Sequence, residues 1–274
     1  MNAILYNGSD DKRFVPEESQ MRIEAFTIDG LPLVGEGDDL AGMILDRVDF
    51  ENYDILAIAS TVVSKVEGRV REISEITPSD EAQRIAQKLD EDPRFVEAVL
   101  DECEEVLIEA PFMLVRRRGG HVCVSAGIDR SNIEEGKLLM LPKNPSQTAA
   151  AIRSRIFEET GKKVTVLITD TNGRAFRVGQ TGIAIGASGM RPLLNWVGRF
   201  DLFGNVLTVT NEAIIDEIAG FANLLMGEGD GGTPAVVIRG LRVFEDVDVF
   251  SDIIRDENED VIIAALRQMK SRDT

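Results

Sequence analysis

The segment Gly227 to Gly232 is the densest candidate for ligand binding in the chain, with four glycines around Glu228 and Asp230. Glycine lets a backbone approach a ligand closely, so the N–H groups here could face phosphates while a carboxylate holds a metal ion. A glycine-rich turn with two solvated acids explains the same residues equally well. The segment also matches the GxGxxG pattern, but a dinucleotide-binding motif needs a strand before it and a helix after it. The predicted order here is the reverse, so a Rossmann fold is not expected.

Two further groups of polar residues follow predicted buried strands. Asp170 and Thr171 follow a strand predicted over 163–169, and Asp129 follows a predicted hairpin. Segments just beyond strand ends favour functional residues, and carboxylate oxygens suit Mg²⁺ and Mn²⁺. The sequence Asp-Thr-Asn-Gly at 170–173 is also typical of a turn whose side chains hydrogen-bond to their own backbone. The two roles do not exclude each other.

Other reactive side chains are few. Lys65 follows a predicted buried strand and could contact phosphate, although a lone lysine is more often solvated. His121 is expected to be structural. Because it is the sole histidine, histidine-rich zinc sites and a catalytic triad built on any other histidine are excluded. Cys103 and Cys123 form no CxxC motif, so no disulfide scaffold is expected. The Walker A motif is absent, which excludes the usual P-loop NTPases.

The elements that must position these residues follow from hydrophobic periodicity and from Gly and Pro. A hairpin is predicted around Gly119-Gly120, and Asn211 is predicted to cap the helix that follows it. Strands adjoin strands as often as helices, which predicts a mixed α+β fold with largely antiparallel sheets. Strands are predicted over 21–28, 53–59, 62–73, 163–169, 205–210 and 235–238. Helices are predicted over 40–48 behind an Asp38 or Asp39 cap, 79–108 with a break near Pro93, 146–161, 211–225 and 258–269.

Composition limits the classes of partner. The 274 residues are 43% hydrophobic, which excludes disorder for most of the chain. No apolar run approaches the roughly 20 residues of a membrane helix. The formal net charge of −18 argues against nucleic acid and anionic membranes as partners. No secretory signal is visible, so a cytoplasmic location is expected. Residues 1–20 are polar and are predicted to be an N-terminal extension or an added tail, and 21–274 the catalytic unit.

Five motifs occur in order along the chain: Gly30-Leu31-Pro32-Leu33, Ser60-Thr61 with Lys65, the run 125–132, Thr169-Asp170-Thr171 and the run 227–234. Together they resemble the coenzyme F-420-0:L-glutamate ligases, the F-420 gamma-glutamyl ligase family. The resemblance extends from about residue 21 to the C-terminus. It implies a mixed α/β fold with two intimate lobes, whose boundary it does not define, and a homodimer. It also implies a GTP-dependent amide ligase that adds L-glutamate to F-420-0 and then further γ-linked glutamate.

The resemblance further implies which residues bind the metal and the nucleotide. Mn²⁺ or Mg²⁺, as two divalent ions, is expected, with K⁺ assisting, and no residue is assigned as catalytic. The implied metal ligands are Asp129, Asp170, Thr171 and Glu228. The implied GTP contacts are Gly30, Leu31, Pro32, Leu33, Ser60, Thr61, Lys65, Asn132, Met226, Gly227, Glu228, Gly229, Asp230, Gly231, Gly232 and Thr233.

The implied chemistry suits these residue types. A carboxylate is a poor acyl donor, but transfer of the GTP γ-phosphate makes an acyl phosphate that the glutamate amine can attack, with release of GDP and phosphate. Phosphoryl transfer depends mostly on positioning and charge neutralisation, which divalent ions would provide in a chain of charge −18. The choice of GTP over ATP rests on the resemblance, since the guanine-reading motif of GTPases is absent. Two alternatives stay open: a metal- and nucleotide-dependent ligase or kinase for another carboxylate, and a non-catalytic GTP-binding regulator.

Overall fold

The computed structural model describes residues 5–6, 12–13 and 22–270. Of the predicted extension 1–20, it describes only β1 (Leu5–Tyr6) and β2 (Lys12–Arg13), which pair antiparallel. The rest of that predicted extension lies outside the described residues. No helix in the described ranges is long and apolar enough to cross a membrane.

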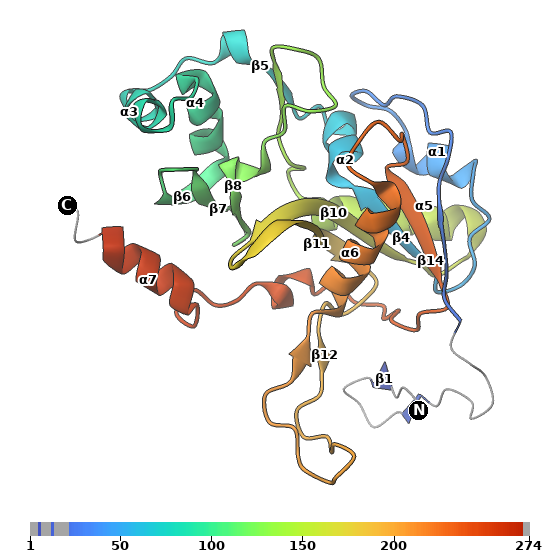
Figure 1. The fold of residues 1–274 in the computed structure, drawn as a ribbon. Helices are drawn as coiled ribbons and strands as arrows, with labels where there is room; N and C mark the ends of the chain where they lie inside the picture. The colour runs from blue at the N-terminus through green and yellow to red at the C-terminus, as the bar shows by residue number, and fades with distance from the viewer. Residues whose placement is uncertain (1–4, 7–11, 14–21, 271–274) are drawn as a thin grey trace.

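A five-stranded sheet forms the centre of the molecule (Figure 1). Its strand order is β11-β10-β4-β14-β3, and only β10 and β4 run parallel. The prediction of a mixed α+β fold with largely antiparallel sheets is therefore confirmed. The strands are β3 (Glu24–Thr27), β4 (Ile55–Ala59), β10 (Thr165–Arg174), β11 (Arg177–Ser188) and β14 (Ala235–Arg239).

Helices cover both faces of this sheet. Successive residues of a strand point to opposite faces, so one strand contributes side chains to both cores. Leu56 and Ile58 pack into one core with helices α1 (Leu40–Leu45), α2 (Ser60–Val66) and α5 (Pro145–Thr160). Ile55 and Ala57 pack into a second core with α6 (Ile214–Met226) on the other face. The sheet thus holds its strand ends rigidly between two helical layers.

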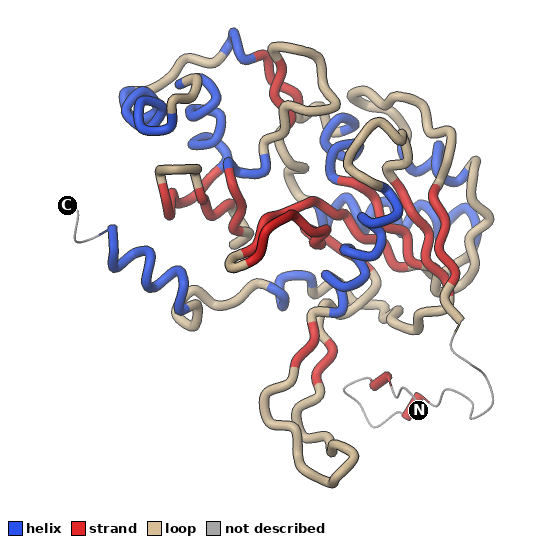
Figure 2. The backbone as a smooth tube through the Cα atoms, in the orientation of Figure 1, coloured by secondary structure: helices blue, strands red, loops and turns tan. Residues whose placement is uncertain are grey.

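A third core lies apart from the sheet (Figures 1 and 2). It is formed mainly by α3 (Asp80–Leu89), α4 (Pro93–Glu102) and β7 (Leu114–Arg117). Strand β7 lies between β6 (Cys103–Ile108) and β8 (Val122–Val124) in a three-stranded sheet, and β6 packs against this core. The short antiparallel pair β5 (Val70–Glu72) and β9 (Lys137–Leu139) joins it to the rest. The predicted division into two lobes, for which the sequence defines no boundary, stays a prediction.

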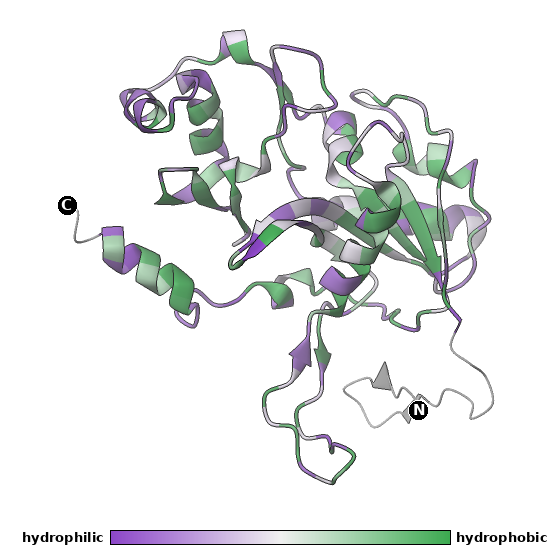
Figure 3. Cartoon of the chain, in the orientation of Figure 1, coloured by the Kyte–Doolittle hydropathy of each residue, from purple (hydrophilic) through white to green (hydrophobic). Residues whose placement is uncertain are grey.

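A long hairpin arm leaves the body between β12 (Leu194–Asn195) and β13 (Asn211–Glu212) (Figure 1). Figure 3 shows hydrophobic residues along this arm. After β14, the chain continues through a 3-10 turn, Phe250–Ile253, to the last helix, α7 (Val261–Lys270). The helix predicted over 258–269 is confirmed.

Several local signals correctly predicted the ends of helices and one hairpin. The Asp39 carboxylate accepts a hydrogen bond from the Gly42 N–H and caps α1. Helix α5 ends at Gly161, which adopts a left-handed φ of +68°. The hairpin predicted around Gly119-Gly120 is formed by β7 and β8. These signals act within a few residues, so they do not depend on the rest of the fold.

Other predicted elements are wrong. The predicted strand over 62–73 is helix α2 followed by the short strand β5, because Val62, Val63 and Val66 are spaced as well for a helix as for a strand. Residues 103–108, predicted as helix, form β6 because they pair with β7. The predicted strand over 205–210 contributes only one bridge, from Val206 to Phe200.

Two further corrections concern polar residues. Asn211 does not cap a helix: it lies in β13, and α6 begins at Ile214 without a side-chain cap. Asp170 does not end its strand, because β10 continues to Arg174 as one arm of a hairpin with β11. Only its parallel pairing with β4 ends there, at Thr169 opposite Ala59.

Candidate active site

One open cleft of about 240 Å³ gathers most of the residues singled out from the sequence. Of the predicted nucleotide and metal residues, only Gly30, Asp230 and Gly231 do not line it. The predicted binding roles of all these residues, inside and outside the cleft, stay predictions. The residues that the structure brings together are Leu31, Pro32, Leu33, Ser60, Thr61, Lys65, Asp129, Asn132, Asp170, Thr171, Met226, Gly227, Glu228, Gly229, Gly232 and Thr233.

The parallel pair β4 and β10 explains why the cleft lies where it does. Parallel neighbours end at the same edge of a sheet, and such edges are frequent ligand sites. Ser60 follows β4 directly and is buried at the start of α2, and Asp170 lies one residue beyond the parallel pairing. The Ser60 hydroxyl donates to Oδ1 of Asp170 over 3.0 Å, across 110 residues of sequence.

Asp170 carries the most perturbed carboxylate of the cleft. Its burial raises the pKa of the carboxyl group to about 6, and the charge of Asp129 adds to the rise. Hydrogen bonds from the Ser60 hydroxyl and the Thr171 N–H oppose this rise without cancelling it. Because ionising Asp170 beside Asp129 is costly, a cation bound between them would stabilise the ionised form.

The loop that follows β8 carries Asp129 and binds the side chain of Lys65. Asp129 accepts hydrogen bonds from the Ser131 N–H at 2.7 Å and the Ser131 hydroxyl at 2.9 Å, which closes a tight turn. The Lys65 ammonium group donates to the backbone carbonyl of Asn132 at 2.6 Å. Lys65 itself lies on the last turn of α2, not on the predicted strand. Its hydrogen bond to Asn132 holds its positive charge beside the loop that carries Asp129.

The chain before Asp129 is strained, a feature that the sequence analysis missed. Ser125 and Ala126 both adopt left-handed φ angles, +50° and +56°, and Gly127 follows at +68°. Left-handed conformations of non-glycine residues cost roughly 1–3 kcal/mol each and concentrate at functional sites. Gly127 was the one sequence signal for this turn. The turn directs Asp129 back toward the cleft.

The glycine-rich loop has the context predicted for it. Helix α6 ends at Met226 before it and β14 starts at Ala235 after it, the reverse of a Rossmann motif. Gly227 and Gly232 have φ angles of +70° and +67°, whereas Gly229 does not need a positive φ. A Cβ added at Gly229 would meet nothing within 4 Å, so the loop leaves open space toward the cleft.

The cleft offers hard oxygen donors to a divalent cation. Asp129, Asp170 and Glu228 all line it, with Thr171 beside them. Among the described residues, no three His, Cys, Asp or Glu side chains lie close enough together to hold a metal as they stand. The donor set and the high pKa of Asp170 fit Mg²⁺ or Mn²⁺, which prefer oxygen ligands and often keep bound water.

A second cavity of about 550 Å³ adjoins the first, with the acids between them. Arg130 lines this second cavity, and its guanidinium lies 3.6 Å from the centre of the Phe95 ring and pairs with Glu91 at 3.0 Å. Cys123 also lines it, but burial raises the pKa of its thiol to about 12, so it is a poor nucleophile. The two cavities share Ser60, Thr61, Asp129, Ser131, Asp170, Thr171 and Glu228.

Sequence comparison identifies the class to which this architecture belongs. The family model described as F420-0:gamma-glutamyl ligase matches residues 30–240, which include both walls of the cleft. The chain belongs to this family.

Individual relatives are similar over nearly their whole length. A protein of Archaeoglobus fulgidus named coenzyme F420:L-glutamate ligase is 54% identical over 90% of this chain and 99% of its own. Proteins with the same name from Methanosarcina mazei and Haloarcula marismortui are 48% and 45% identical, over 92% and 90% of this chain and 100% and 98% of their own.

Proposed function

We propose that this chain is a GTP-dependent amide ligase that joins L-glutamate to coenzyme F-420-0 and then adds further γ-linked glutamate. The observation that carries the proposal is the meeting of two cavities at Asp129, Asp170 and Glu228. A ligase of this kind must bring a nucleotide and a second anion to one point. Family membership and the names of the relatives support F-420 and L-glutamate as the substrates that are joined.

In this proposal the smaller cavity holds the nucleotide. Its phosphates face the open backbone of the loop from Gly227 to Gly232 and the ammonium of Lys65. Lys65 is fixed to the Asn132 carbonyl, so it adds a positive charge in one place rather than along a mobile side chain. Asn132, with a left-handed φ of +50°, shapes the loop that holds it.

The larger cavity receives the acceptor carboxylate. An oxygen of that carboxylate attacks the γ-phosphorus, and GDP leaves as the new acyl phosphate forms. The glutamate amine then attacks the acyl carbon, loses its proton and expels phosphate. Asp129, Asp170, Thr171 and Glu228 would hold two Mn²⁺ or Mg²⁺ ions, assisted by K⁺, which supply neutralisation of the phosphate charge. These residues line both cavities, so the positive charge would lie at their junction.

We also propose a cytoplasmic homodimer. The arm between β12 and β13 supports a second copy as partner, because several of its large apolar side chains are left exposed by the described part of the chain. Phe200, Leu202 and Phe203 are 69%, 86% and 92% exposed. Apolar side chains gathered on one projecting element are typical of a protein interface.

Mass spectrometry tests the reaction. The protein is incubated with F-420-0, GTP, Mn²⁺ and L-glutamate, and the expected product is heavier by one or more glutamyl residues, with GDP and phosphate released. Product with ATP but not GTP overturns the choice of nucleotide. Amide formation on other acids but not on F-420-0 favours a ligase for another carboxylate. Nucleotide binding without phosphate release favours the non-catalytic regulator.

A further inference from the structure

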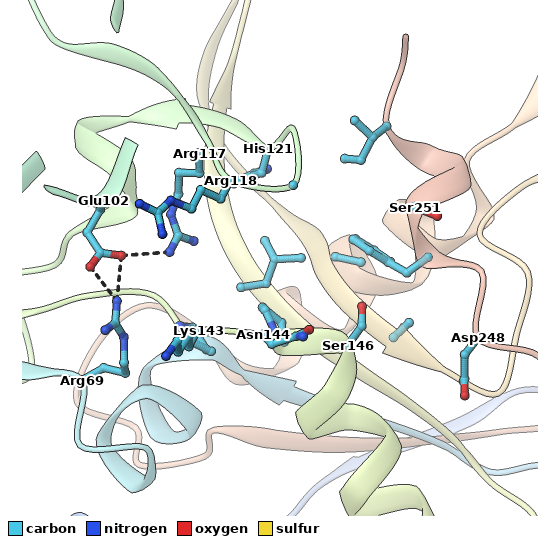
Figure 4. Close-up of a pocket in the computed structure, with 18 of the residues that line it drawn as sticks. Arg69, Glu102, Arg117, Arg118, His121, Lys143, Asn144, Ser146, Asp248 and Ser251 are labelled. Carbon is cyan, nitrogen blue, oxygen red and sulfur yellow. Dashed lines mark hydrogen bonds and ion pairs between the residues drawn. The ribbon is translucent and has the colours of Figure 1, made fainter. Parts of the chain in front are cut away.

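A third cavity, of about 660 Å³, lies away from the active site and shares no lining residue with the two cavities there (Figure 4). Its floor includes Ala184, Ile185 and Ala187 of β11, the outermost strand of the central sheet. The β7–β8 hairpin, the start of α5 and the turn at Phe250–Ile253 form its walls. The cavity is thus a crevice between the third core and the free edge of the sheet.

Cationic side chains gather at one end of this crevice. Figure 4 shows Arg117 and Arg118 on one side and Arg69 and Lys143 facing them. Arg69 and Arg117 share Glu102, at 2.7 and 3.2 Å. The charged groups of Arg118 and Lys143 have no hydrogen-bond or ion-pair partner among residues 22–270, in a chain of net charge −18. Two uncompensated cations in one crevice of an acidic protein attract anions.

Further polar groups lie beside these charges. Helix α5 spans 16 residues and presents its N-terminus to the crevice through Asn144 and Ser146, and such ends carry a partial positive charge. This end lies against β11 because residue 186 is glycine: a Cβ there would stand 2.5 Å from the Ser146 nitrogen. In the hairpin wall, Nε2 of His121 and Nε of Arg117 are buried without a hydrogen-bond partner in the described part of the chain.

The opposite end of the crevice is acidic. Asp248 lies there, on the same side of the view as Ser251 and below it (Figure 4). The Ser188 hydroxyl donates to Asp248 at 2.6 Å, and Arg153 lies 3.7 Å away, so its charge is only partly compensated. A ligand with carboxylates at one end and an ammonium group at the other matches this distribution of charge.

We propose that this crevice is a binding site for an amino acid with two or more carboxylates, of the class of glutamate and short γ-linked glutamyl chains. In a γ-linked glutamyl chain the two carboxylates of the last residue bind Arg118, Lys143 and the N-terminus of α5, and the ammonium group of the first residue, which shares its carbon with a carboxylate, faces Asp248. The ligand class rests on the proposed function, since that reaction consumes glutamate and lengthens a γ-glutamyl chain. The anion site itself rests only on the crevice.

Calorimetric titration of the full-length chain with γ-L-glutamyl-L-glutamate, without nucleotide, metal or F-420-0, tests the site. Binding is expected, and Arg118→Gln and Lys143→Gln should each weaken it about tenfold or more, because each removes a charged donor without breaking an internal ion pair. Lys162→Gln is the matched control. Lys162 follows the far end of α5, about 24 Å along that helix, and loses the same charge.

A second measurement locates the ligand. His121 is the only histidine, so its imidazole NMR signals are unambiguous, and they should move during the titration. Absence of binding to wild type overturns the site, as does unchanged affinity in both crevice variants, Arg118→Gln and Lys143→Gln. Binding of inorganic phosphate with equal or higher affinity overturns the carboxylate class. None of these results depends on turnover, so a failed ligase assay and a failed crevice proposal are separate outcomes.

Discussion

At the scale of single residues, Asp170 combines burial with a position between two cavities. Its neighbours Ser60 and Thr171 supply hydrogen bonds, but burial still raises the pKa of its carboxyl group. A protein keeps such a costly group where a bound cation offsets the cost.

We expect Asp170→Asn to lower kcat about 100-fold or more, because it removes one anionic oxygen ligand and keeps the side-chain shape. Glu228→Gln should act in the same direction. The measurement is turnover at saturating GTP over a range of Mn²⁺ concentrations, with circular dichroism to verify folding.

Glu217→Gln is the control for this pair. Glu217 is exposed on α6, before the glycine-rich loop, and lines neither cavity of the active site, so loss of its charge should change turnover little. Near-normal activity of Asp170→Asn at limiting Mn²⁺ would show that Asp170 is not a metal ligand.

His121 provides a residue-scale test that does not involve catalysis. Burial, with the nearby charge of Arg117, lowers its pKa to about 4. In the unfolded chain the imidazole has its ordinary pKa of about 6.5, so protonation below that pH favours the unfolded state. The free energy of unfolding is therefore unaffected by His121 above pH 6.5, and it declines as the pH falls from there to about 4. Proton NMR of the single imidazole should give that low pKa, and His121→Asn should reduce the loss of stability between pH 7 and 4.5. A midpoint near 6.5 would contradict the buried, neutral state.

At the scale of elements, the loop between α6 and β14 separates two roles of glycine. Gly227 adopts φ +70°, which valine tolerates poorly, whereas Gly229 has an ordinary φ and open space around it. A substitution at one position therefore strains the backbone, and at the other only occupies the cleft.

We expect Gly229→Val to raise the Michaelis constant for GTP about tenfold or more with a nearly unchanged free energy of unfolding. Gly227→Val should instead lower the free energy of unfolding by about 1–2 kcal/mol. Thermal melts with and without GTP and Mn²⁺ distinguish the two effects. If Gly229→Val gains as much stability from the ligand as wild type, the loop does not contact the nucleotide.

At the scale of the whole molecule, the arm from β12 to β13 carries the proposed dimer contact (Figure 3). The double substitution Leu202→Ser and Phe203→Ser removes two of its most exposed apolar side chains. Light scattering after size-exclusion chromatography should show a dimer for wild type and a monomer for this variant. Val261→Ser on α7 is the control, since Val261 is also exposed but lies on another element. A monomeric wild type would refute the dimer, and a dimeric double variant would place the interface elsewhere.

Much of the local structure is determined by short stretches of sequence. Asp39, Gly161 and the pair Gly119-Gly120 each define an end or a turn through contacts within a few residues. The acids and glycines of the cleft could also be recognised from their types and their order along the chain. Their chemistry, hard oxygens and an open backbone, does not depend on how distant segments meet.

The tertiary structure decided what depends on distant segments. The residues from 60 to 66 form a helix because Val63 packs into the first core, although their pattern also suits a strand. Residues 103–108 form a strand because β7 pairs with them. The hydrogen bonds of Ser60 with Asp170 and of Lys65 with Asn132 join segments 110 and 67 residues apart. Periodicity is a local property, whereas strand pairing, burial and the pKa of Asp170 arise only when those segments pack together.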